Sequence, residues 1–129
     1  MIALLLKLLA EGRNVEIEVA GMSMAPLLLR GDRILIAPIG ERDFRLHDIV
    51  VLRTEGRLLA HRVIALHPLR TEGDQSLEID PEWPPDSVVG RVVAFRRGPR
   101  LIKLGSPEGL LRNWWSRFSR WRVPRQAAF

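Results

Sequence analysis

Three kinds of side chain in the sequence could together perform nucleophilic chemistry: a serine, a histidine and an aspartate. Ser23 lies in the turn 21–26, which follows a strand-like run. A nucleophilic serine needs an exposed hydroxyl near backbone N–H groups, and a turn after a strand offers both. His61 lies within an apolar run, and histidine is well suited to accept a proton near neutral pH. His47 and His67 fall in predicted loops and are interpreted as surface residues.

Two aspartates follow the candidate base. Asp74 and Asp80 lie 13 and 19 residues after His61. Either could orient the imidazole as the third member of a triad. Every one of these residues also has a structural interpretation, because serine is common in turns and both aspartates adjoin a turn-forming Gly or Pro. A histidine in a strand is often simply half-buried with one hydrogen bond.

The amino-acid composition limits which catalytic and metal-binding groups the chain can use. The chain has 129 residues and 47% hydrophobic side chains, which suits one folded domain with a modest core. It has no cysteine, which excludes a disulfide framework, a thiolate metal site and a cysteine nucleophile. No metal or organic cofactor is indicated. Only Lys7 and Lys103 are lysines, so few residues other than histidine can serve as a general base.

The charge is divided unevenly along the chain. Residues 1–95 hold 11 basic and 14 acidic side chains, a net −3, whereas residues 96–129 hold nine basic and one acidic, a net +8. The longest apolar stretch, Ile2–Ala10, is far shorter than the roughly 20 residues of a transmembrane helix. It also lacks the basic start and small-residue exit of a secretory signal. We therefore expect a cytoplasmic or peripheral-membrane protein with no transmembrane segment and no signal peptide.

The elements that must position the candidate site are mostly short strands. Residues 2–11 favour a helix that stops at Gly12. Alternating or apolar runs predict strands at 15–19, 33–37, 49–53, 58–66, 88–95 and 100–104, with loops at 38–45 and 67–85. Many short strands without intervening helices are typical of a mainly β domain.

The C-terminal segment differs from the rest. Ser106, Pro107 and Glu108 form a helix start, and Pro124 ends the helix predicted over 107–122. Its apolar residues fall within one arc of about 140° at 100° per residue: Leu110, Leu111, Trp114, Trp115, Phe118 and Trp121. The chain thus divides into a short apolar helix (1–12), a β domain with the candidate site (13–105) and a basic, Trp-rich amphipathic tail (106–129).

Four segments, in order and with suitable spacing, resemble the type I signal peptidases and the related LexA-type self-cleaving repressors. They are GMSMAPLLLRGDRILI at 21–36, DIVVLR at 48–53, LAHRVIAL at 59–66, and EGDQSLEID at 72–80 with VVGRVVAF at 88–95. The resemblance covers about residues 15–95. It implies a mainly β fold of coiled antiparallel sheets, a serine endopeptidase activity and a peptide or precursor-protein substrate.

The resemblance also assigns roles. Bacterial signal peptidases and LexA-type proteins use a lysine base, but the matching segment here carries His61, which is similar to the archaeal and endoplasmic-reticulum signal peptidases. It implies Ser23 as the nucleophile, His61 as the base and Asp80 as the acid, with Asp74 as a structural or supporting carboxylate. Gly21 stands where many signal peptidases have a hydroxyl residue, as in the LexA-type motif, so backbone N–H groups must form the oxyanion hole. A chain starting this close to its first strand is expected to be a short member without the usual anchor.

The sequence is also compatible with other functions. One is a LexA-type self-cleaving protein, although few residues precede Ser23 and they form no helix-turn-helix motif. Another is a non-catalytic peptide- or membrane-binding module on the same fold. The Trp-rich tail favours peripheral membrane contact or a homo-oligomer over nucleic acid, because its arginines alternate with a bulky apolar face.

Overall fold

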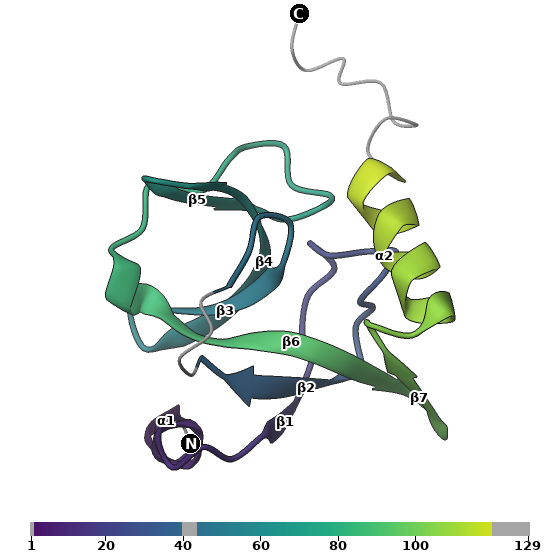
Figure 1. The fold of residues 1–129 in the computed structure, drawn as a ribbon, viewed down its shortest axis with the longest axis horizontal. Helices are drawn as coiled ribbons and strands as arrows, with labels where there is room; N and C mark the ends of the chain where they lie inside the picture. Colours follow the sequence, from purple (N-terminus) through teal and green to yellow (C-terminus); the bar gives the residue numbers. More distant parts are fainter. Residues whose placement is uncertain (1, 40–43, 120–129) are drawn as a thin grey trace, which may run out of the picture.

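The computed structural model describes residues 2–39 and 44–119. They form one antiparallel sheet of seven strands with a short helix near each end (Figure 1). The strands are β1 (Val15–Glu18), β2 (Arg33–Pro38), β3 (Ile49–Thr54), β4 (Arg57–Leu66), β5 (Leu69–Glu72), β6 (Val88–Arg97) and β7 (Arg100–Lys103). The helices are α1 (Ile2–Ala10) and α2 (Pro107–Phe118), and a 3₁₀ turn, η1 (Pro85–Ser87), precedes β6. The predicted mainly β class is confirmed.

The sheet is strongly curved. Its strand order is β1-β2-β6-β3-β4-β5, with β7 paired to β6. The pairing register shifts within β2, β3 and β4, and such bulges bend a strand and increase its twist. Figure 1 shows the result: β3, β4 and β5 curl around one side of the molecule, while β2, β6 and β7 extend below them. The curvature brings segments that are distant in sequence onto β4, which carries His61.

Strand β3 is buried on both faces, which explains its continuous apolar sequence. Ile49 and Val51 belong to one cluster of core residues, and Val50 and Leu52 belong to another. The first cluster includes Phe95 and the α1 residues Leu5 and Leu9, so it lies between the sheet and the N-terminal helix. The second includes Val63 and Leu69 and lies inside the curl of β3, β4 and β5.

One predicted loop contains a strand. The loop predicted over 67–85 includes β5, which pairs with the second half of β4 through Val63↔Thr71 and Leu66↔Leu69. Leu69 and Thr71 are buried, whereas the residues between and after them are half-buried. Four residues between turn-forming neighbours are too few for the alternation to stand out in the sequence.

The predicted start of the C-terminal helix is confirmed. The Ser106 hydroxyl oxygen accepts a hydrogen bond from the Gly109 N–H at 3.1 Å, and Pro107 occupies the first turn. The predicted residues Trp121 and Pro124 lie outside the described residues. Neither of the described helices is long and apolar enough to cross a membrane.

A buried carboxylate fixes the turn that follows the candidate serine loop. Asp32 accepts hydrogen bonds from the Leu29 N–H at 2.8 Å and from Arg97 on β6 at 2.9 and 2.7 Å. Burial alone would raise the pKa of Asp32, but the hydrogen bonds from Arg97 and Leu29 outweigh it and hold the pKa below its usual value. Arg97 also donates to the Leu27 carbonyl at 3.0 Å, so this ion pair links the loop to the sheet.

Replacing Asp32 by asparagine should lower the free energy of unfolding by about 2 kcal/mol at pH 7, because charge-assisted hydrogen bonds are worth roughly that much. A carboxyl whose pKa is lowered by folding contributes fully above its unfolded pKa of about 4 and loses the contribution as the pH falls through the folded value. Urea unfolding of the wild type and Asp32→Asn should therefore converge below about pH 4.

The exposed acid Glu108 provides the control for that measurement. It pairs with Arg100 and Arg112 at the surface, where ion pairs contribute little, so Glu108→Gln should leave stability almost unchanged. A stability difference for Asp32→Asn that stays constant from neutral to acid pH would show that its charge does not stabilise the fold.

Candidate active site

Ser23 lies in a turn that is anchored in the core on one side. Its neighbours Met24, Leu27 and Leu28 are all buried, whereas Met22 on the other side is 45% exposed. The apolar LLL sequence after the turn is thus explained by packing beneath the serine. Ser23 itself is half-buried, between its buried and its exposed neighbours.

His61 connects the candidate nucleophile to a carboxylate. It lies in the middle of β4, opposite Val50 of β3, and is 5% exposed. Its Nε2 lies 3.1 Å from Ser23 Oγ, and its Nδ1 lies 2.5 Å from Asp80 Oδ2. Three segments that are 38 and 19 residues apart in sequence thus meet in one hydrogen-bonded row.

The loop after β5 closes over the serine turn. The Gln75 N–H donates to the Ser23 carbonyl at 2.8 Å, and the Gln75 side chain donates to the Ala25 carbonyl at 2.9 Å. Gly73 allows this approach, because a Cβ at that position would lie 2.8 Å from the Ser23 carbonyl oxygen and 2.9 Å from His61 Nε2. Any other residue at position 73 would push the loop away from the candidate site.

The two aspartates have separate positions. Asp80 is bound to His61, whereas Asp74 is fully buried and binds the adjacent strand residue Arg62 through two 2.7 Å hydrogen bonds. Asp74 also accepts from the Ser116 hydroxyl of α2 at 2.6 Å. The sequence left open which aspartate adjoins the histidine, and the geometry brings Asp80 there.

Arg62 joins further segments to this buried carboxylate. Its Nη1 donates to the His47 carbonyl at 2.9 Å and to Asn113 Oδ1 of α2 at 2.8 Å. Arg62 is only 2% exposed, so its charge is balanced within the protein rather than by water. This buried network links β4, the loop after β5 and α2 behind the candidate site.

Asp80 has hydrogen-bond partners besides the histidine. Its Oδ2 accepts from the Thr71 hydroxyl at 2.6 Å, and the Thr71 carbonyl accepts from the Asp80 N–H at 2.9 Å. The Trp83 indole Nε1 in turn lies 2.7 Å from Thr71 Oγ1. Thr71, the partner of Asp80, and Trp83, the partner of Thr71, both lie in the segment 67–85 that the sequence predicts as a loop.

His47 lies in a turn, as expected from the sequence, but it is less exposed than a free surface residue. It is half-buried, and its Nε2 lies 2.8 Å from Arg117 Nη2 of α2. Burial, with the guanidinium groups of Arg117 and Arg62, lowers the pKa of His47, which therefore accepts from Arg117 as a neutral imidazole. His67 is exposed, as expected for a loop residue.

The sequence does not identify several residues of the site. For some of them it contains a weak indication of their role, and for others it contains none. Arg62 stands out as a charge inside the apolar run LLAHRVIAL, which is a sign of a buried ion pair. The sequence indicates Gly73 only as a turn residue. In the structure a glycine is needed there because a Cβ would collide with the Ser23 carbonyl oxygen and His61. Thr71, Trp83 and Ser116 carried no signal, because their roles depend on long-range contacts.

A groove of about 760 Å³ opens in front of Ser23. It is lined by β1 and the residues after it, 16–20, by the β4 residues Leu58–Ala60, and by Ile2 and Leu5 of α1. Across residues 2–39 and 44–119, no group of three or more His, Asp or Glu side chains is arranged to hold a metal ion. The arrangement is suited to proton transfer from a serine hydroxyl to a carboxylate-bound imidazole beside an extended groove.

Comparisons with known protein families and with curated proteins identify no relative of this chain.

Proposed function

We propose that this chain is a serine endopeptidase of the type I signal peptidase kind, with Ser23 as nucleophile, His61 as general base and Asp80 as the orienting acid. The observation that carries the proposal is the row of hydrogen bonds from Ser23 Oγ through His61 to Asp80, at 3.1 and 2.5 Å. Serine hydrolases on unrelated folds share this set of groups and distances. The coiled antiparallel sheet supports the extension of the family resemblance to the fold.

The proposed reaction is acyl transfer. Ser23 Oγ attacks the peptide carbonyl carbon while His61 Nε2 takes the hydroxyl proton. Backbone N–H groups of the turn, including that of Ser23, stabilise the oxyanion. The C–N bond then breaks, and His61 returns the proton to the leaving amine. A water molecule, deprotonated by His61, hydrolyses the acyl-enzyme and restores the serine.

The substrate in this proposal is an extended peptide. The groove in front of Ser23 is flanked by β1, which pairs with β2 on one side, and by the first half of β4, which pairs with β3. The strand β5 pairs with β4 only from Arg62 onward. A peptide strand placed between these two edges would gain backbone hydrogen bonds from both. Small side chains before the scissile bond follow from the family resemblance.

The histidine-base subtype is supported by the positions of the lysines. Lys7 lies on α1 and Lys103 on β7, and both are exposed. His61 occupies the β4 position that the resemblance gives to the general base. We therefore propose that the chain belongs with the archaeal and endoplasmic-reticulum forms rather than with the lysine-base enzymes.

The exposed face of α2 favours a second property, contact with a membrane. The helix packs on the domain through its small residues Gly109 and Ser116, and a Cβ at Gly109 would collide with the backbone at Lys103. This leaves Leu110, Leu111 and Trp114 exposed by 58, 67 and 57% on what we call the outer face of α2.

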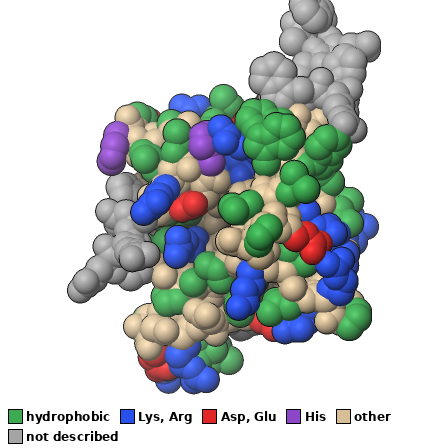
Figure 2. Space-filling view, turned by 45° about the vertical axis from the view of Figure 1, so that its right-hand side comes forward, with side chains coloured by type: hydrophobic (Ala, Val, Ile, Leu, Met, Phe, Trp, Pro, Cys, Tyr) green, Lys and Arg blue, Asp and Glu red, His purple; other side chains and the backbone are tan. Residues whose placement is uncertain are grey.

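Apolar and basic side chains adjoin each other on this side. Figure 2 shows hydrophobic side chains gathered in the upper part of the view, with Lys and Arg side chains close to them. Tryptophan favours the membrane interface, and each arginine near an anionic surface adds about 1 kcal/mol. The net charge of +8 over residues 96–129 supports anionic lipid over self-association as the partner.

Substitution of the proposed nucleophile or base should abolish peptidase activity without unfolding the domain. Ser23→Ala and His61→Ala should each lower kcat by about 10⁴-fold or more, because triad members act as a unit. The readout is mass spectrometry of precursor peptides from the same cells, together with labelling of Ser23 by a serine-reactive phosphonate probe. Ser87→Ala and His67→Ala are the matched controls and should behave as wild type. Wild-type cleavage rates in Ser23→Ala would contradict the assignment.

Substitution of the two aspartates should have different effects, one on catalytic activity and the other on stability. Asp80→Asn should lower kcat by about 10⁴-fold, because an amide cannot stabilise the imidazolium or hold its tautomer. Asp74→Asn should instead lower the free energy of unfolding by about 3 kcal/mol, because it leaves Arg62 buried without its counter-charge. Paired measurements of cleavage rate and urea unfolding distinguish the effects. The opposite ranking of the two variants would make Asp74 the catalytic acid.

Binding to anionic vesicles should depend on the outer face of α2. The full chain should co-sediment with phosphatidylserine-containing vesicles, less so at high salt, and the double substitution Leu110→Glu with Trp114→Glu should abolish binding. Leu4→Glu, on the exposed side of α1 at the opposite end of the molecule, is the control (Figure 1). A chain that stays in solution with these vesicles and runs as a salt-resistant dimer would indicate self-association instead.

A further inference from the structure

Two residues behind the proposed catalytic acid form an extension of its hydrogen-bonded row. Thr71 is fully buried on β5, and its hydroxyl lies 2.6 Å from Asp80 Oδ2. Trp83 Nε1 lies 2.7 Å from the same hydroxyl. The backbone fixes both residues, because the Asp80 N–H donates to the Thr71 carbonyl at 2.9 Å and the Trp83 N–H donates to the Leu69 carbonyl at 3.1 Å.

The chemistry of these groups fixes the direction of each hydrogen bond. An indole N–H can only donate, so Thr71 Oγ1 must accept from Trp83. The single hydroxyl proton of Thr71 is then directed to Asp80, whose carboxylate can only accept. The Thr71 O–H therefore holds the Asp80 side chain in the orientation that places this same oxygen, Oδ2, 2.5 Å from the Nδ1 of His61.

A carboxylate oxygen held against Nδ1 favours one tautomer of the imidazole. With its proton on Nδ1, the neutral His61 presents a lone pair on Nε2, which lies 3.1 Å from the Ser23 hydroxyl. The other tautomer would direct an N–H at Ser23 and a lone pair at the carboxylate, and it could not take the serine proton. Two donors, the Thr71 hydroxyl and His61 Nδ1, thus converge on one oxygen of Asp80, Oδ2.

We propose that Thr71 and Trp83 are positioning residues that hold His61 in the Nδ1–H tautomer through Asp80. The catalytic meaning of this tautomer rests on the proposed peptidase function, but the tautomer itself does not. Neither residue lines the groove in front of Ser23. Their substitution should therefore change kcat and leave KM close to its wild-type value.

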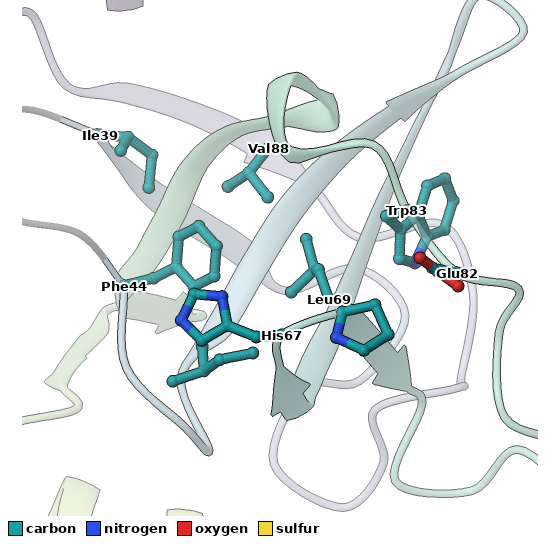
Figure 3. Close-up of a pocket in the computed structure, with 9 residues that line it drawn as sticks. Ile39, Phe44, His67, Leu69, Glu82, Trp83 and Val88 are labelled. Atoms are coloured by element: carbon teal, nitrogen blue, oxygen red, sulfur yellow. The ribbon is translucent and has the colours of Figure 1, made fainter.

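Trp83, at the end of this hydrogen-bonded row, adjoins a second pocket. Trp83 lines a hollow of about 640 Å³, together with Phe44, Leu66, Leu69 and Val88 (Figure 3). No lining residue of this hollow also lines the groove at Ser23. Trp83 thus contributes to this hollow, while its indole N–H donates to the buried hydroxyl of Thr71 behind Asp80.

The test compares three variants of the full chain. Thr71→Val keeps the shape and deletes the hydroxyl, and Thr71→Ser keeps the hydroxyl. Trp83→Phe keeps an aromatic ring and deletes the N–H donor to the Thr71 hydroxyl. The first readout is the ¹⁵N spectrum of histidine-labelled protein near neutral pH without substrate, with the His61 signals assigned from His61→Gln. The second is kcat and KM for peptide cleavage.

The expected results are specific to the hydroxyl. The wild type and Thr71→Ser should show a single Nδ1–H tautomer of His61, whereas Thr71→Val and Trp83→Phe should show a mixture. Thr71→Val should lower kcat about tenfold, which corresponds to one hydrogen bond to a charged group, and Thr71→Ser should restore most of that rate. Thr54→Val, at the β3–β4 turn, is the control for loss of a hydroxyl elsewhere.

The outcomes separate this inference from the proposed function. If His61 shows one Nδ1–H tautomer in both Thr71→Val and Trp83→Phe, the inference is wrong even when the wild type cleaves peptides. If Thr71→Val does not fold, Trp83→Phe decides by the same spectrum. If the tautomer depends on Thr71 but the wild type cleaves no peptide, the positioning role stands and the peptidase proposal fails.

Discussion

The buried ion pair between Arg62 and Asp74 is the interaction on which the arrangement of the candidate site depends. Arg62 comes from the strand that carries His61, and Asp74 comes from the loop that reaches Ser23 and Asp80. Both charges are almost fully removed from water, which is tolerable only because each is hydrogen-bonded on several sides. The pair has a directional preference that an apolar contact would lack, so it fixes how the loop meets the strand.

Two rows of hydrogen bonds therefore share one strand and serve different purposes. The row through His61 contains groups suited to proton transfer and opens onto a groove. The neighbouring row through Arg62 is closed to solvent and reaches α2. Their separation explains why two aspartates only six positions apart can have such different surroundings, one beside an imidazole and the other beside a guanidinium.

The sequence predicted local elements well and long-range partners poorly. Strands such as β2 and β6 follow from their apolar patterns, and the N-cap of α2 follows from Ser106 and Pro107. The strand β5 was missed because four residues give too little periodicity, and its Thr71 acquires meaning only when Asp80 folds back onto it. Residue type and family resemblance were enough to propose Ser23, His61 and Asp80. The buried contact of Asp74 with α2 could not be predicted, because no local sequence pattern specifies it.

The C-terminal helix has two sides with different consequences for the design of shortened proteins. Through Ser116 it donates to Asp74 and accepts from the Leu27 backbone, so it completes the scaffold behind the candidate serine. Cutting the chain before Ser106 would remove this support along with the exposed tryptophans. A truncated protein that keeps residues through Ser119 would retain every described contact of the helix with the domain, and it would be the better starting point for crystallisation or NMR spectroscopy.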